Sequence, residues 1–291
     1  MLPTNETFVA NDAVVFVPQD QRAPSRPDRD RTEKTLDELD GLWDRLSAGE
    51  RSVVPPLDYE LPAGFRLSVV IPVYNEKATI REVIARVRAL PMDTEIIIVD
   101  DFSTDGTRDW LETLQGMPGL RLIFKPANEG KGAALRTGFA EATGDVVVVQ
   151  DADLEYNPCD LPAILQPIVS GEADVVYGSR FLGDELRDKS PFHRLVNRIL
   201  TGASNLFTGL HLTDMETCYK AFRREVLQEL PLQQSRFGFE PEVTAKLARR
   251  DYRVVERPVR YSARGYAQGK KIGVSDALNA LYCVVRYGLA D

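Results

Sequence analysis

The stretch Val146–Pro158, which reads VVVVQDADLEYNP, constrains this chain most. The four consecutive β-branched residues Val146–Val149 are too few to span a membrane and are typical of a strand buried on both faces of a parallel sheet. Three carboxylates follow at alternating positions: Asp151, Asp153 and Glu155. If the chain stays extended here, their side chains project to the same side. The stretch therefore predicts oxygen ligands at the carboxyl end of a central strand, where open α/β sheets bind ligands.

Carboxylates this close together repel one another unless a cation lies between them. Ligation by oxygen alone favours Mg²⁺ or Mn²⁺, ions that keep coordination positions open for phosphate oxygens. The alternative is an acidic turn with solvated Asp side chains, because an Asp-x-Asp pattern alone often occurs without a metal. The buried valine run before the acids favours the metal site, with Asp151, Asp153 and Glu155 as ligands.

Composition excludes several classes of protein. The formal net charge of the 291 residues is -8 and no basic block stands out, so no nucleic-acid partner is expected. The three cysteines are odd in number and widely spaced, as in proteins of a reducing cytosol. No secretory signal and no run of about eighteen apolar residues is recognised. We therefore expect a cytoplasmic protein whose membrane contact, if any, is peripheral and at the cytoplasmic face.

The sequence divides into three parts. Residues 1–62 form an extension that contains a linker rich in Arg, Asp and Pro and a short amphipathic helix around Leu36–Leu46. We interpret it as a docking or oligomerisation element. Residues 63–272 alternate strands and helices, as a catalytic domain of the α/β class would. Residues 273–291 form an amphipathic helix, which either packs on the domain or lies on lipid.

The alternation of strands and helices predicts a mostly parallel sheet with right-handed crossovers. A helix is expected to open at a capping box over Thr79–Glu82, and another at Gly130–Gly132. The loops that follow the predicted strands gather at one edge of such a sheet. These loops are Tyr74–Glu76, Asp100–Asp105, Asp151–Glu155 and Ser179–Arg180. Later segments predict a long helix over Phe192–Phe207, a helix from Glu240–Pro241 and a strand over Arg253–Tyr261.

A metal at a strand end, with Asp101 and Lys131 on the neighbouring loops, suits a nucleotide bound through its diphosphate. Dinucleotide oxidoreduction is the competing use of such a sheet. It requires Gly-x-Gly-x-x-Gly after a strand, whereas Gly130-Lys131-Gly132 has Leu135 where the third glycine is needed. A P-loop is also absent from the sequence.

Four ordered motifs resemble the signature of family 2 glycosyltransferases with the GT-A fold, the fold of nucleotide-diphospho-sugar transferases. They are Val70–Glu76, Ile98–Thr107, Asn128–Gly132 and Asp151–Asp153. Within that family the chain is most similar to the branch of dolichyl-phosphate mannose synthases and polyprenyl-phosphate glycosyltransferases. The resemblance covers Leu67–Lys271.

The resemblance implies a role for each matched position. It places the nucleotide-sugar pocket at Pro72, Tyr74, Glu76, Asp100, Asp101, Lys131, Asp151 and Ala152. It places the metal at Asp151, Asp153 and Glu155, and catalysis at Asp153, Arg180 and Asp214. Contacts to acceptor or phosphate groups fall to Arg194, Arg264, Lys270 and Lys271, the last three in a loop that closes over the site. His193 and His211 are expected to be bystanders.

Several departures from the family pattern leave donor and acceptor open. Glu155 stands where the mannose synthases have Gln, Tyr156-Asn157-Pro158 replaces His-Pro-Pro, and Cys218 replaces a common Gly. The transmembrane helices that follow the catalytic domain in many polyprenyl-phosphate members are not found, and the 62-residue lead lies outside the pattern.

The implied function is a metal-dependent, inverting hexosyl transfer from a nucleotide-sugar, of the GDP-mannose or UDP-glucose type, to a polyprenyl or dolichyl phosphate. A phosphate acceptor is already anionic, so Arg180, Lys270 and Lys271 need only position it. A saccharide or other hydroxyl acceptor is the alternative and would need a general base, for which Asp214 is the candidate. A non-enzymatic nucleotide-sugar-binding scaffold is less favoured. A homo-oligomer and a partner membrane subunit both stay open. Arg180 could instead only pair with a carboxylate, and Asp214 could only cap a turn.

Overall fold

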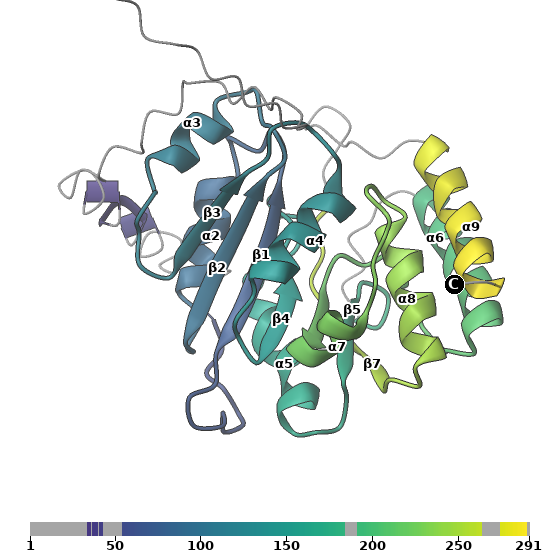
Figure 1. The fold of residues 1–291 in the computed structure, drawn as a ribbon. Coiled ribbons are helices and arrows are strands. Elements are labelled where there is room, and N and C mark those ends of the chain that lie inside the picture. Colours follow the sequence, from purple (N-terminus) through teal and green to yellow (C-terminus); the bar gives the residue numbers. More distant parts are fainter. Residues whose placement is uncertain are drawn as a thin grey trace, which may run out of the picture.

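A seven-stranded sheet with helices on both faces forms the centre of the molecule (Figure 1). The structure is a computed structural model that describes residues 54–183, 191–263 and 274–289, together with 34–35, 37–39 and 41–42. The strands, in sheet order, are β3 (Leu120–Phe124), β2 (Thr94–Asp100), β1 (Leu67–Val73), β4 (Val146–Val149), β6 (Lys220–Arg223), β5 (Val175–Ser179) and β7 (Val254–Pro258). In this sheet β6 alone runs antiparallel to its neighbours. The predicted mostly parallel sheet is therefore confirmed.

The valine run is the central strand that the sequence predicts. β4 pairs with β1 from Leu67↔Val146 to Val70↔Val149 and with β6 on its other side. Its four side chains are buried, because both sheet faces are covered at this position. The carboxyl ends of β1, β2, β4 and β5 consequently lie along one edge of the sheet.

The helices mostly follow the sequence prediction. They are α2 (Ile80–Arg88), α3 (Thr107–Glu112), α4 (Lys131–Glu141), α5 (Leu161–Val169), α6 (Pro191–Thr208), α7 (Arg224–Glu229), α8 (Phe239–Arg249) and α9 (Val274–Leu289), with a 3₁₀ turn, η1 (Pro158–Asp160). α3, α5 and α7 were not predicted. α5 contains Pro162 in its first turn and Pro167 in its interior. Because proline usually ends a helix, a segment with an interior proline is not predicted as helical from its sequence.

The capping box predicted at the start of α2 is wrong. The Thr79 side chain accepts no hydrogen bond from the first turn, and its backbone is already helical. Its hydroxyl instead donates to the Glu76 carboxylate at 3.0 Å, and Glu82 pairs with Arg86. The Thr79 side chain therefore hydrogen-bonds to the loop after β1 and does not cap the helix.

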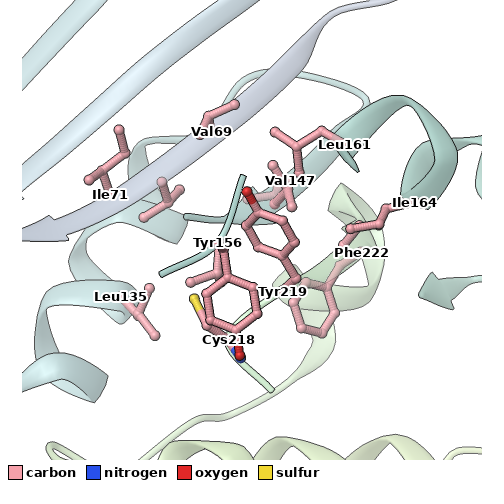
Figure 2. Close-up of a cluster of buried hydrophobic side chains, with 14 of the residues drawn as sticks. Val69, Ile71, Leu135, Val147, Tyr156, Leu161, Ile164, Cys218, Tyr219 and Phe222 are labelled. Atoms are coloured by element: carbon pink, nitrogen blue, oxygen red, sulfur yellow. The ribbon is translucent and has the colours of Figure 1, made fainter. Parts of the chain in front are cut away.

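The hydrophobic core extends directly beneath the loop-bearing edge of the sheet. Figure 2 shows Val69 and Ile71 of β1 in one cluster with Leu161 of α5, and with Tyr156 and Tyr219 beside them. The Tyr156 and Tyr219 rings lie 4.7 Å apart between centroids. The floor of the edge is consequently rigid, while the loops above it carry polar side chains.

Three helices form a separate layer next to β5 and β7. α6, α8 and α9 pack on one another, and α9 lies alongside α6 at the rim of the molecule (Figure 1). α9 buries Ala280, Val284 and Tyr287, so one side of this helix packs on the domain. In the parts of the chain with described coordinates, no helix combines the length and apolar character that crossing a bilayer requires.

Part of the N-terminal extension packs on the domain. Residues 34–35, 37–39 and 41–42 are helical, and Leu39 is buried in the main core with Leu42 against it. The other residues of the predicted helix and the predicted linker up to residue 33 lie outside the described residues.

Candidate active site

The loops at the carboxyl edge of the sheet surround a cleft of about 810 Å³. Its walls come from the ends of β1, β2, β4 and β5 and from α4, α6, α8 and α9. Ten of the residues implied by the resemblance line it: Pro72, Tyr74, Glu76, Asp101, Lys131, Asp151, Ala152, Asp153, Glu155 and Arg180. The predicted convergence of loops far apart in sequence is thus confirmed.

Three of the strand exits that face the cleft, those after β1, β2 and β4, contain a residue with left-handed backbone. Asn75 (φ 54), Phe102 (φ 68) and Leu154 (φ 61) follow β1, β2 and β4. Non-glycine residues rarely adopt this conformation, and such residues concentrate at functional sites. The Asn75 side-chain oxygen accepts the backbone N–H of Thr104 at 2.7 Å, so the loops after β1 and β2 hold each other in place.

The two adjacent aspartates after β2 have different environments. Asp100 is fully buried, accepts the backbone N–H of Ser103 and pairs with Arg108 at 2.6 Å. Asp100 does not line the cleft, so the structure does not support its implied contact with the nucleotide. Asp101 does line the cleft, and its carboxylate accepts the backbone N–H groups of Glu129 and Gly130 at 3.0 and 2.7 Å. Asp101 therefore fixes the loop that leads into α4.

Lys131, the first residue of α4, lies at the middle of a buried ionic network. Its ammonium is 3.0 Å from the Asp151 carboxylate and 3.3 Å from that of Glu240. Burial lowers the pKa of Lys131, but the charges of Asp151 and Glu240 outweigh burial and hold that pKa well above its usual value. The lysine stays cationic in the cleft, as a contact to a diphosphate requires.

The glycines on either side of Lys131 allow a second loop to approach. Gly130 has φ 96, and a Cβ there would lie 2.5 Å from the carbonyl oxygen of Ser235. A Cβ on Gly132 would lie 2.3 Å from the carbonyl oxygen of Gln234. The Gly-Lys-Gly pattern thus seats residues 234–236 against the start of α4.

The segment with the three carboxylates after β4 is not extended as predicted, although all three line the cleft. The chain turns at residues 152–155, with Leu154 in the left-handed region, and so loses the extended alternation. Asp153 Oδ1 accepts the backbone N–H of Glu155 at 3.1 Å, and Glu155 accepts the Tyr261 hydroxyl at 2.8 Å. Within the described ranges no cluster of three or more His, Cys, Asp or Glu side chains could hold a metal ion. A metal site built on the described residues alone would therefore need further ligands, such as substrate phosphates.

Arg180, which follows β5, forms a two-point ion pair with Asp214. Arg180 Nε and Nη2 donate to the two Asp214 oxygens at 2.6 and 2.7 Å, and the Arg180 backbone N–H donates at 3.1 Å. Asp214 is 0% exposed and does not line the cleft, whereas Arg180 does. A general base must reach the acceptor, so this geometry argues against that role for Asp214 and makes it a positioning residue for Arg180.

Of the remaining implied phosphate contacts, Arg194 alone is among the residues that the structure describes. Arg194 is on the exposed surface of α6 and is absent from the cleft lining, which corrects its implied role. Its neighbour His193, expected to be a bystander, does line the cleft. Arg264, Lys270 and Lys271 lie outside the described residues.

The sequence analysis missed several cleft residues. Glu216 and Glu240 come from the loop before β6 and the first turn of α8, and Asn197 and Phe237 also contribute. Glu240 follows a recognised helix start, but nothing in its local pattern distinguishes a cleft-facing acid from a solvated one. Long-range packing brings these residues to the cleft. They could not be predicted from the expectation that binding residues follow the carboxyl ends of strands.

Comparisons with known proteins agree with this geometry. The family model described as Glycosyl transferase family 2 matches residues 68–231. The chain belongs to glycosyltransferase family 2. It is 31% identical to the undecaprenyl-phosphate mannosyltransferase of Micrococcus luteus, over 77% of this chain and 95% of that protein. It is 30% identical to the dolichol-phosphate mannosyltransferase of Pyrococcus furiosus, over 76% of this chain and 64% of that protein.

Solved structures show the fold of this glycosyltransferase. A crystal structure of glucosyl-3-phosphoglycerate synthase from Mycobacterium tuberculosis, with Mn²⁺, uridine diphosphate and phosphoglyceric acid, matches with a TM-score of 0.60 at 23% identity. The match covers 79% of this chain and 80% of that one. The predicted GT-A fold is confirmed.

Proposed function

We propose that this glycosyltransferase moves a sugar from a nucleotide-sugar to the phosphate of a polyprenyl phosphate, with inversion at the anomeric carbon and with Mg²⁺ or Mn²⁺ bound. One observation carries the proposal: a single cleft is polar at the strand ends and apolar where α6 and α9 form its wall. The names of the Micrococcus and Pyrococcus relatives, both transferases to polyprenyl-type phosphates, support the same acceptor class.

The polar end of the cleft suits the donor. Tyr74 and Glu76 offer a ring and a carboxylate to a nucleoside, and Asp101 holds the adjacent loop in place. Lys131 supplies positive charge for the diphosphate, provided that the diphosphate displaces part of its contact with Asp151. The structure thus supports a donor pocket that runs from β1 to the start of α4.

The carboxylates after β4 fit a divalent cation in chemical kind. Asp151 and Asp153 present hard oxygen ligands on the cleft wall, next to Lys131. Mg²⁺ is commonly held by one or two carboxylates plus substrate phosphates and water, which agrees with a set of protein ligands that is incomplete on its own. When bound, the cation would neutralise the departing diphosphate. Glu155 is a weaker candidate ligand because it already accepts the Tyr261 hydroxyl.

The apolar end of the cleft suits an isoprenoid chain. Val196, Ile199 and Leu200 come from α6, and Ala277, Leu278 and Leu281 come from α9. Arg180 lies between this wall and the strand ends, where its guanidinium can orient an acceptor phosphate. Because a phosphate is anionic at neutral pH, its oxygen can attack without a general base. A hydroxyl acceptor would need one, and the buried, ion-paired Asp214 does not supply it.

The outer surfaces of the same helices suit contact with a bilayer. Leu195 and Leu206 lie on α6 at helical spacing, and both are exposed and absent from the cleft lining. Tyr282 and Leu289 are the corresponding exposed residues on α9. The exposed Arg194 and Arg198 flank the α6 stripe and would attract anionic headgroups. This apolar face of α6 and α9 would place the cleft at the cytoplasmic membrane face, where a polyprenyl phosphate is held.

Calorimetric titration with GDP and with UDP, each with and without Mn²⁺, tests the donor half of the proposal. We expect one nucleotide to bind, and its binding to weaken strongly without the cation. Binding of neither nucleotide with Mn²⁺ present would contradict a nucleotide-sugar transferase. The Lys131→Met variant, which keeps side-chain length but removes the charge, should weaken binding of the same nucleotide about tenfold to hundredfold.

A further inference from the structure

Two buried carboxyl oxygens on the cleft wall have no hydrogen-bond partner among the described residues. They are Glu240 Oε2 and Glu216 Oε1. Glu240 is 4% exposed, and its other oxygen lies 3.3 Å from the Lys131 ammonium. Buried polar atoms are nearly always paired in folded proteins, because leaving one unpaired is costly. An unpaired atom on the wall of a ligand cleft therefore indicates a group that the ligand supplies.

The position of the two acids identifies which part of the substrates they meet. Glu240 contacts Lys131, which also contacts Asp151 on the proposed diphosphate side. Glu216 lies two residues after Asp214, the partner of Arg180, and Arg180 and Glu240 both act on it electrostatically. The two carboxyl groups thus lie between the residues proposed to hold the donor diphosphate and the residue proposed to orient the acceptor phosphate. The sugar must pass between these two points.

The chemistry of the two side chains excludes the other parts of the substrates. A carboxylate repels a phosphate, and an isoprenoid chain offers no hydrogen bond. Hydroxyl groups remain, and they can donate to a carboxylate and accept from a carboxylic acid.

The protonation of the two groups agrees with recognition of hydroxyls. Burial, followed by the nearby charge of Glu240, raises the pKa of Glu216 to about 8. At neutral pH Glu216 can therefore donate a hydrogen bond as a neutral acid. Glu240, next to the Lys131 cation, can accept one.

We propose that Glu240 and Glu216 bind hydroxyl groups of the sugar being transferred, and that they select the donor sugar by the configuration of those hydroxyls. This inference rests on the proposed function. It assigns sugar specificity to the loop before β6 and the start of α8, outside the strand-end motifs.

The test compares binding of a nucleoside diphosphate with binding of the matching nucleotide-sugar. The probes are GDP against GDP-mannose and UDP against UDP-glucose, titrated with Mn²⁺ into the full chain. In Glu216→Met, which removes the polar atoms at similar volume, we expect the diphosphate to bind as in the unsubstituted protein. The nucleotide-sugar should bind about tenfold to hundredfold more weakly. Glu240→Gln should act in the same direction.

Two further variants separate recognition from structure. Glu216→Gln keeps a donor and an acceptor and should restore most of the nucleotide-sugar affinity. Glu112→Gln, an exposed acid on α3, should change neither titration. Thermal unfolding of each variant checks that it is folded.

The outcomes are distinct. Loss confined to the nucleotide-sugar supports the inference. Nucleotide-sugar affinity unchanged in both Glu216→Met and Glu240→Gln overturns it and leaves the proposed function standing. Equal weakening of diphosphate and nucleotide-sugar also overturns it, because the acids would then only shape the cleft. Failure of the unsubstituted protein to bind either diphosphate overturns the proposed function, and the inference with it.

Discussion

The two halves of the cleft are built differently. The donor side, from β1 to β4, consists of neighbouring parallel strands whose exit loops hold one another through short hydrogen bonds, as Asn75 does with Thr104. The acceptor side, from β5 to α9, depends on buried charges brought together from distant segments, such as Arg180 with Asp214. The donor side is therefore built from contacts between the exit loops of neighbouring strands, whereas the acceptor side depends on the packing of the whole domain.

The outer surfaces differ in the same way. Around the donor side, exposed positions are mostly polar, and ion pairs such as Arg66 with Asp93 lie in solvent. On the acceptor side, α6 and α9 expose leucines and a tyrosine. An exposed apolar surface marks a contact with another partner. We infer that the acceptor side alone approaches lipid.

The largest effect is expected at the donor side. Asp153→Asn should lower the rate of sugar transfer on the order of a hundredfold to a thousandfold, because it removes a charged oxygen from the proposed metal site. Asn retains an acceptor for the Glu155 backbone N–H, so the loop should keep its shape. The check is the initial rate of sugar transfer at several Mn²⁺ concentrations. The exposed Asp109→Asn serves as control, and an unchanged rate for Asp153→Asn would remove Asp153 from the site.

The free energy of unfolding should be most sensitive to substitutions at the acceptor side. Asp214→Asn leaves the Arg180 cation buried without a charge partner and should lower the free energy of unfolding by about 3–5 kcal/mol. The matched change at a solvent-exposed pair, Asp93→Asn opposite Arg66, should cost no more than about 1 kcal/mol. Urea unfolding of both variants measures the difference.

The same pair distinguishes a positioning role from a general base. If Asp214 only orients Arg180, the pH dependence of the residual activity in Asp214→Asn should keep its shape. The double variant Arg180→Met with Asp214→Leu should also be more stable than Asp214→Asn alone. Loss of the low-pH limb from the pH profile would instead restore Asp214 as the general base.

A smaller effect is expected at the apolar face of α6 and α9. Leu206 is 82% exposed, so Leu206→Glu should not change stability. It should weaken binding to vesicles of anionic phospholipid about tenfold, because one leucine leaves the apolar contact and a negative charge is added. Vesicle cosedimentation measures this. Gln115→Glu on the donor side adds the same charge and should leave binding nearly unchanged. Equal loss in both variants would mean that charge alone governs the contact.

A further effect concerns the pH dependence of stability. Because the folded-state pKa of Glu216 is raised to about 8 from 4.5, the folded protein binds more protons than the unfolded chain between these values. This group therefore reduces stability as pH rises towards 8. As pH rises over this range, the melting temperature of Glu216→Gln should increase relative to that of the unsubstituted protein. Lys220, whose pKa burial lowers to about 8, has the opposite influence above pH 8, so the comparison belongs below it. A constant difference in melting temperature would contradict the assignment.

Much of the donor side could be predicted from sequence because its signals are local. The Val146–Val149 run, the polar residues after it and Gly130–Gly132 identified the strand, the strand end and the helix start. The prediction that the segment after β4 stays extended was wrong because of one backbone angle. Leu154 lies in the left-handed region, which ends the alternation that would align the carboxylates.

The acceptor side could be predicted only in part, for the same physical reason. The amphipathic patterns of α6 and α9 were recognised, but a pattern does not say which apolar residues remain exposed. Asp214 was singled out as a catalytic residue, yet its side chain forms an ion pair with Arg180, 34 positions away in the sequence, and does not line the cleft. Arg194 and His193 are adjacent, and only the helical rotation decides which one faces the cleft.

The central claim is that one cleft joins a nucleotide-sugar to a lipid-linked phosphate. The most direct measurement is transfer of radiolabelled sugar from GDP-mannose or UDP-glucose to undecaprenyl phosphate in detergent with Mn²⁺, followed by organic extraction. The account predicts a labelled lipid that does not form with undecaprenol, which lacks the phosphate, or with Asp153→Asn. A donor that binds but labels only a water-soluble hydroxyl acceptor would contradict the account and assign the apolar end of the cleft to another ligand.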